Sequence, residues 1–361
     1  MSHRPQQPAA LYSIQLLRGV AALFVVLFHA RGSLNGYNSI GDTLFINGYI
    51  GVDIFFIISG FIFQYVTRPT TAPRNFMLRR IIRILPLYLV AVVVLYIAQG
   101  NYTLRSFASA VLRTTIFIPN ANENPPFFGY AFLGAGWTLV YEMAFYSLFA
   151  LALAWSRRFY SALVCVAIIA LVTLPQLAMT GAISLHPSRV PLMPHAYLGV
   201  VTNPMMLEFT FGVGLAYAYQ RGMLNAALKP WVGLVFYAAA AALFLLPPFS
   251  GHGPFNFGIA AFLVVSGSLC LENTIRRFAP NLALAVGTGS YSLYLFHQPA
   301  FALVKPLTES LPGWAEFSIF VGSALLLATI AYRLFERPIV SLGQSLLHNK
   351  AVRSKLALGS Q

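Results

Sequence analysis

Long apolar runs separated by short polar breaks recur along the chain. Each run is close to twenty residues, the length that an α-helix needs to cross about 30 Å of hydrocarbon. This pattern predicts an all-α, polytopic integral membrane protein with about ten transmembrane helices. The predicted spans are Ile14–Ala30, Ile46–Val66, Ile84–Ala98, Trp137–Trp155, Ser161–Met179, Val200–Gln220, Trp231–Leu246, Phe255–Leu271, Leu282–Val304 and Ala315–Leu334.

The composition supports a chain that has the bilayer as its solvent. Of the 361 residues 58% are hydrophobic and only 9% are charged, whereas roughly a quarter are charged in a soluble domain. We expect one transmembrane domain over residues 1–340 and a short basic cytoplasmic tail over residues 341–361. The longest outer connection, residues 100–136, is expected to hold an interfacial helix at Leu104–Phe117 and to act as a lid or acceptor surface.

The net charge of +14 would suggest a nucleic-acid partner in a soluble protein. With the N-terminus inside, however, 18 of the 23 lysines and arginines fall in segments predicted to be cytoplasmic. Cytoplasmic loops of membrane proteins collect such residues. The charge therefore predicts that both termini are cytoplasmic, and no nucleic-acid partner is expected.

Several classes of protein lose support because their signatures are absent. The chain contains no GxxxxGK[ST], HExxH or GxSxG motif, which argues against P-loop ATPases, zincins and serine hydrolases. Both cysteines, Cys165 and Cys270, lie inside apolar runs, so we interpret them as packing residues. No metal site is expected.

Ionisable residues inside membrane spans are costly, so each one is a candidate for function. Arg18 and His29 are eleven residues apart, about three helical turns, and share nearly one face. Asp53 begins the next span at a similar depth, where a carboxylate–imidazole pair with His29 would make that ring a better general base. The alternatives are a snorkelling arginine, an interfacial histidine and a structural ion pair.

Other polar positions allow two interpretations each. Ser59 lies mid-span beside Gly60, where close helix packing is favoured over nucleophilic catalysis. Arg80 and Arg83 share one face of a basic cytoplasmic loop, and suit anionic lipid or a phosphorylated ligand equally. Glu142 lies deep in its span and has either a structural or a site role.

Two further ionisable residues, Glu208 and His297, are interpreted as structural.

Taken in order, five segments of the chain resemble the membrane acyltransferase family 3, in its exopolysaccharide O-acetyltransferase branch. They are IQLLRGVAALFVVLFHA, GVDIFFIISGFI, FMLRRIIRILPLY, GWTLVYEMAFY and, near the C-terminus, GSYSLYLFHQP with FERP. One departure is that Tyr141 and Met143 flank Glu142 where the family often has a second acidic residue.

The resemblance implies an integral membrane O-acyltransferase in the inner (cytoplasmic) membrane of a bacterium. It would move an acyl group, usually acetyl, from cytoplasmic acyl-CoA to a hydroxyl of a cell-surface or exopolysaccharide carbohydrate, lipid-linked or polymeric. Acetyl-CoA would be the donor, and no metal is implied.

The resemblance also implies two groups of site residues. The catalytic group is His29, Asp53 and Glu142, and the donor-binding group is Arg18, Ser59, Arg80 and Arg83. His29, oriented by Asp53, would deprotonate the acceptor hydroxyl as it attacks the thioester. An acyl-histidine intermediate is the alternative route.

The main rival is a proton-coupled secondary transporter of a polar small molecule, in which the same intramembrane His, Asp and Glu would relay protons. Such a fold predicts internal repeats with helices broken at matching positions. The sequence shows no repeat of fixed period, so the enzyme is favoured. A scaffold for polymer assembly ranks last, because it would leave Arg18 and His29 without a purpose.

Overall fold

The computed structural model describes residues 10–36, 38–100, 103–224, 230–244, 246 and 250–358, with side chains up to residue 347. These residues form helices and connecting loops and no strand, which confirms the all-α prediction. Arg4 and Lys229, which contribute to the predicted cytoplasmic charge, lie outside the described residues, as do the side chains of most of the basic tail.

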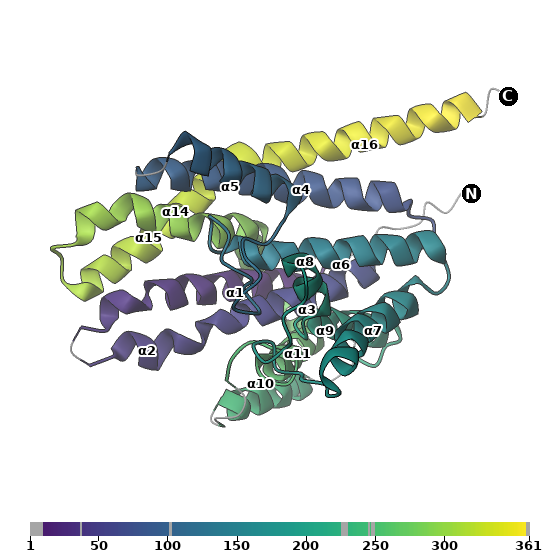
Figure 1. Ribbon diagram of the computed structural model, residues 1–361, viewed down its shortest axis with the longest axis horizontal. Coiled ribbons are helices and arrows are strands. Elements are labelled where there is room, and N and C mark those ends of the chain that lie inside the picture. The colour runs from purple at the N-terminus through teal and green to yellow at the C-terminus, as the bar shows by residue number, and fades with distance from the viewer. Residues whose placement is uncertain are drawn as a thin grey trace.

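The helices follow one another along the chain as shown in Figure 1. The elements are α1 (Tyr12–Ala30), η1 (Arg31–Leu34), α2 (Ile40–Phe45), η2 (Ile46–Tyr49), α3 (Ile50–Val66), α4 (Pro73–Gln99), α5 (Leu104–Ile116), α6 (Gly136–Trp155), α7 (Tyr160–Thr180), α8 (Ala196–Thr202), α9 (Met206–Gln220), α10 (Pro230–Phe244), α11 (Phe257–Cys270), α12 (Glu272–Phe278), α13 (Pro280–Thr288), α14 (Ser290–Thr308), α15 (Gly313–Ala331), η4 (Tyr332–Glu336) and α16 (Arg337–Leu358).

Seven helical segments of the described chain are long and apolar enough to cross a membrane, or eight if the bent pair α11 and α12 forms one span. The helix α10 is apolar but shorter. The chain is thus a multi-pass membrane protein. A helix, α5, also lies where the interfacial helix at Leu104–Phe117 was expected.

Two predicted spans are interrupted. Residues 200–220 form α8 and α9, because Pro204 lacks a backbone N–H and the Asn203 side chain accepts a bond from the Met205 N–H. Residues 282–304 form α13 and α14, which separate at Gly289. Apolar runs show where a helix can lie, but local backbone bonding decides where it breaks.

The basic segment before the third span is a helix, so its assignment as a loop over residues 67–83 was wrong in part. Helix α4 begins at Pro73 and runs without interruption into the apolar stretch. Proline suits the first position of a helix, where its missing N–H would have no partner anyway. Arg80 and Arg83 are therefore held on a rigid helix.

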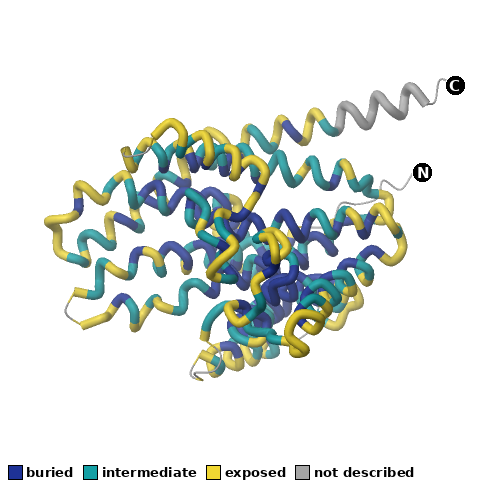
Figure 2. The backbone as a smooth tube through the Cα atoms, viewed as in Figure 1, coloured by how far each residue is buried: buried dark blue, intermediate teal, exposed yellow. Residues whose placement is uncertain are grey.

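Helix α3 lies at the centre of the bundle and contacts α1, α9 and α11. A Cβ atom at Gly60 would lie 2.0 Å from the Phe209 carbonyl oxygen, so the α3 and α9 backbones can touch only because residue 60 is glycine. Figure 2 shows buried residues concentrated in this centre and exposed residues on the outer helices. Helix α7, for example, presents Val166, Leu174 and Leu177 outward, as a lipid-facing surface requires.

Candidate active site

Three cavities follow one another through the bundle. The first, which we call the mouth cavity, has a volume of about 320 Å³, the central cavity about 80 Å³, and the His29 cavity about 300 Å³. Arg18 and Arg83 line both the mouth and the central cavity. Val52 and Tyr294 line both the central and the His29 cavity. The three cavities therefore share their walls at two junctions.

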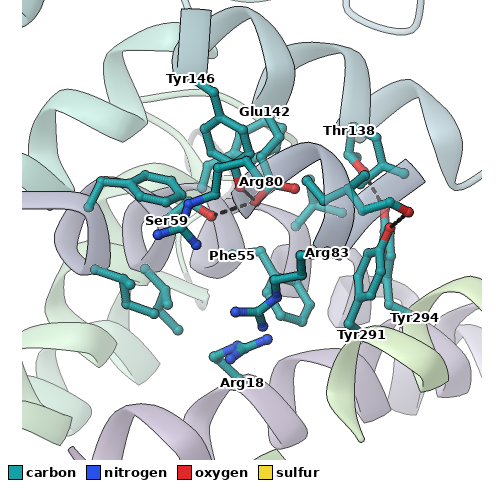
Figure 3. Close-up of a pocket in the computed structure, with 17 residues that line it drawn as sticks. Arg18, Phe55, Ser59, Arg80, Arg83, Thr138, Glu142, Tyr146, Tyr291 and Tyr294 are labelled. Carbon is teal, nitrogen blue, oxygen red and sulfur yellow. Dashed lines mark hydrogen bonds between the residues drawn. The ribbon is translucent and has the colours of Figure 1, made fainter. Parts of the chain in front are cut away.

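The central cavity is lined by an excess of positive charge. Figure 3 shows Arg18 from α1, and Arg80 and Arg83 from α4, extending into it. Among the described residues that line it, Glu142 is the only carboxylate. Cations that are partly withdrawn from water without enough counter-charge are unfavourable, so this cavity favours an anionic ligand.

Arg80 is positioned by aromatic rings. Its guanidinium carbon lies 4.3 Å from the Phe63 ring centroid and 5.6 Å from that of Phe76. A guanidinium stacks well on such rings and keeps its in-plane donors for other groups. Within the described part of the protein the Arg80 Nε atom has no hydrogen-bond partner. Arg80 is therefore placed to donate to a ligand.

Glu142 is the centre of a small hydrogen-bond network. Its carboxylate accepts a bond from the Ser59 Oγ at 3.1 Å and another from the Tyr146 hydroxyl, one turn further along α6. The Ser59 hydroxyl is directed to a carboxylate in this arrangement, and it lines the central cavity. The structure thus brings together the predicted donor-binding residues of α1, α3 and α4 and places Glu142 of α6, predicted as catalytic, beside them.

Tyr294 of α14 stands at the junction with the His29 cavity. Its hydroxyl is hydrogen bonded to the Thr138 Oγ1 at 2.8 Å and to the Ala135 carbonyl at 3.2 Å. Its ring packs against Phe55, with 5.6 Å between the centroids. The hydroxyl and the ring are both fixed, so this wall is well defined.

The His29 cavity has a different lining. Its walls include Tyr49, Phe127, Tyr130 and Trp137, together with His29, and contain no Arg, Lys, Asp or Glu among the described residues. The residues from 126 to 135 belong to the long connection expected to act as a lid or acceptor surface. Aromatic walls with a few directed polar groups are typical of a site for a neutral, partly polar ligand.

His29 lines this cavity, and one of its ring nitrogens makes a hydrogen bond within the protein. Its Nδ1 lies 2.8 Å from the Val25 carbonyl oxygen. Because a carbonyl can only accept, Nδ1 carries the hydrogen and Nε2 keeps a free lone pair. The ring also packs on that of His297, 4.8 Å away, whose own Nδ1 donates to the Tyr294 carbonyl. His29 is therefore oriented by a backbone carbonyl.

The predicted pairing of Asp53 with His29 is wrong. The Asp53 carboxylate pairs instead with the His252 Nδ1 at 2.8 Å and accepts the Gly253 N–H at 3.2 Å. The reason is helical phase. Gly51 faces α1, since a Cβ there would lie 2.3 Å from the Ala21 carbonyl oxygen. Asp53, two residues on, is rotated by about 200° and faces away from α1.

His252 is the site residue that the sequence analysis missed. It lies in the connection between α10 and α11, flanked by Gly251 and Gly253, both with positive φ. Its ring lines the same cavity as His29. A histidine between two glycines was the available signal, but a loop residue has no helical phase from which a partner can be inferred.

Two further observations concern the buried carboxyl group of Glu208 and the absence of a metal-binding cluster among the described residues. Glu208, interpreted from the sequence as structural, is fully buried beside Asp53. Within the described residues, no three His, Cys, Asp or Glu side chains are grouped so as to hold a metal ion.

The fold and these cavities define a multi-pass membrane protein with an arginine-lined site next to a histidine-lined one. Residues 11–333 match the family model described as "Acyltransferase domain", the third acyltransferase family. The chain belongs to that family. It is an acyltransferase of the O-acetyltransferase type.

Individual relatives cover most of the chain. The exopolysaccharide production protein ExoZ of Rhizobium meliloti is 30% identical over 89% of this chain and 96% of its own length. The acyltransferase MdmB of Streptomyces mycarofaciens is 26% identical over 91% and 88%. The peptidoglycan O-acetyltransferase OatA of Listeria monocytogenes is 24% identical over 91% of this chain, which spans only 55% of that relative. No solved structure matches the chain.

Proposed function

We propose that this protein transfers an acetyl group from acetyl-CoA to a hydroxyl of a cell-surface carbohydrate. The observation that carries the proposal is the row of three cavities, arginine-lined at one end and His29-lined at the other, with shared walls. Such a row lets a charged donor and a neutral acceptor approach one reaction centre from opposite faces.

The donor would enter from the cytoplasm, in the inner membrane of a bacterium. Both ends of the chain would face the cytoplasm, as the distribution of Lys and Arg predicts. The mouth cavity, lined by Arg18, Arg83 and Arg337, would hold donor phosphates by charge-assisted hydrogen bonds. The small central cavity is suited to the thioester end alone, with Arg80 and Ser59 in its walls.

The acceptor would occupy the His29 cavity. Aromatic faces such as those of Tyr130 and Trp137 pack against the C–H faces of a sugar ring, while polar groups such as Gln298 direct its hydroxyls. The names of two relatives refer to exopolysaccharide and peptidoglycan, both carbohydrate polymers. A carbohydrate, polymeric or lipid-linked, is the acceptor that fits these features.

His29 would act at the point where donor and acceptor meet. Its free Nε2 lone pair can take the proton of the acceptor hydroxyl as that oxygen attacks the thioester. The same lone pair can instead attack the thioester first and carry the acetyl group. Glu142 would hold the central cavity in shape through Ser59 and Tyr146. Both routes need Nδ1 fixed, which the Val25 carbonyl provides.

The test is transfer of label from acetyl-CoA. Membranes containing the protein are incubated with acetyl-labelled CoA thioester and candidate bacterial glycans, and the glycan is then isolated. Covalent label in the glycan, dependent on the protein, is expected. Uptake of the glycan or its precursor without covalent label would overturn the proposal in favour of a proton-coupled transporter.

A further inference from the structure

The His29 cavity contains a second histidine with its own carboxylate. The His252 side chain is 10% exposed and the Asp53 side chain is 0% exposed, and the two are 2.8 Å apart. The rings of Tyr49 and Trp137 meet the His252 ring edge to face, at 4.9 and 5.4 Å between centroids. His252 is therefore held rigidly, with Nε2 as the ring nitrogen left for a ligand.

The Asp53 carboxylate has further neighbours besides His252. The Gly253 N–H donates to its other carboxylate oxygen, so both oxygens are in use. The buried Glu208 carboxyl lies beside it. Asp53 is the carboxylate that contacts His252 directly, so it is the counter-charge available once His252 has taken up a proton.

The aspartate–histidine pair is the arrangement that makes an imidazole an effective base. His29 lacks it, because its Nδ1 bonds to a neutral carbonyl. If His29 carries the acetyl group, its Nε2 lone pair is consumed, and it can no longer accept the acceptor's proton. A second base is then required in the same cavity.

We propose that His252, paired with Asp53, is that base: it deprotonates the acceptor hydroxyl in the second half of a two-step transfer. This inference rests on the proposed function and selects between its two routes. His252 is thus assigned as a further catalytic residue, one that touches the acceptor.

The two steps balance in atoms and charge. In the first, the His29 Nε2–carbon bond forms and the carbon–sulfur bond breaks, which leaves an acyl-imidazolium and a thiolate that takes a proton from water at the mouth cavity. In the second, the acceptor oxygen–carbon bond forms, the carbon–nitrogen bond breaks and the hydroxyl proton moves to His252 Nε2. Neutral His29 is regenerated, and His252 releases its proton to water in its own cavity.

The decisive variant is His252→Asn. The asparagine amide can donate to Asp53 from the position of the histidine Nδ1, so the connection between α10 and α11 stays attached to α3. It has no atom that can replace Nε2 as a base. A purely structural role of His252 therefore predicts retained activity, whereas a base predicts its loss.

The variant is incubated in detergent with acetyl-labelled CoA thioester, without and with a glycan that wild type acetylates. We expect glycan labelling to fall by about 10²–10⁴-fold, the usual contribution of a general base. Rapid mass spectrometry of the peptide containing His29 should show an added acetyl group that persists when glycan is present. In wild type the same modification should disappear on addition of glycan.

Two controls fix the interpretation. The double variant His29→Ala with His252→Asn should show no added acetyl group on that peptide. The variant His195→Asn changes an exposed histidine at the start of α8 and should behave like wild type.

The outcomes separate the two proposals. Normal labelling of glycan by His252→Asn, or lost labelling without acetyl on the His29 peptide, overturns the role of His252 while the wild-type transfer stands. Absence of transfer by wild type overturns the proposed function and this inference with it.

Discussion

The central cavity and the His29 cavity share the walls formed by Val52 and Tyr294, yet they differ in charge and size. The central cavity has three arginines against one glutamate in about 80 Å³. The His29 cavity, of about 300 Å³, has no Arg, Lys, Asp or Glu among the described residues that line it. One cavity is thus suited to part of an anionic ligand and the other to a neutral, hydroxyl-rich ligand. Neighbouring sites in one helix bundle can select opposite chemistry because, of these two, α4 lines only the central cavity, whereas loop residues such as Tyr130 line only the His29 cavity.

The largest effect is expected from His29→Ala. Loss of its Nε2 removes both routes proposed for the transfer, so glycan labelling should fall by about 10²–10⁴-fold. Affinity for CoA, measured by calorimetry in detergent, should be unchanged because the arginines are intact. Full activity in a normally inserted variant would contradict a role of His29 in the transfer. It would also contradict the assignment of the His29 cavity as the place where the acceptor reacts.

A smaller effect is expected from the double variant Arg80→Ala with Arg83→Ala. A hydrogen bond to a charged group contributes about 1.5–3 kcal/mol, so affinity for CoA should weaken by at least about tenfold. The acceptor KM should stay near the wild-type value. The matched control is Arg79→Ala, an exposed arginine on the same helix. Equal CoA affinity in both variants would contradict donor binding by Arg80 and Arg83 and favour the alternative that they contact anionic lipid.

The smallest effect is expected from Tyr130→Ala, which changes the wall of the His29 cavity. Tyr130 is 55% exposed and stacks on Phe127 at 4.8 Å between centroids, so its removal should leave the fold intact. Loss of one aromatic contact of about 0.5–1.5 kcal/mol should raise the acceptor KM about two- to tenfold. CoA affinity should not change. A change in donor affinity instead of acceptor KM would contradict the assignment of this cavity.

Much of the architecture could be predicted from the sequence because hydrophobic length is a local property. The spans expected at Ile14–Ala30 and Ser161–Met179 correspond to α1 and α7 within a few residues. The motif that carries Arg80 could be located from the sequence, but the position of Arg80 in the wall of a cavity could not. The basic segment before the third span was predicted to be a loop, but α4 already begins at Pro73. The prediction failed because the polarity of a segment does not decide its backbone conformation.

The sequence by itself determined that the chain lies in a membrane, where the apolar runs are that can form helices, and which segments resemble the acyltransferase family. Only the tertiary structure decided which ionisable groups meet. Asp53 is close to His29 in predicted depth, yet it faces the opposite side of α3 and pairs with His252, 199 residues away along the chain. The physical reason is that the rotation of a helix about its axis is set by packing, here by Gly51 against α1 and Gly60 against α9. That rotation gives the His29 cavity two histidines with different partners.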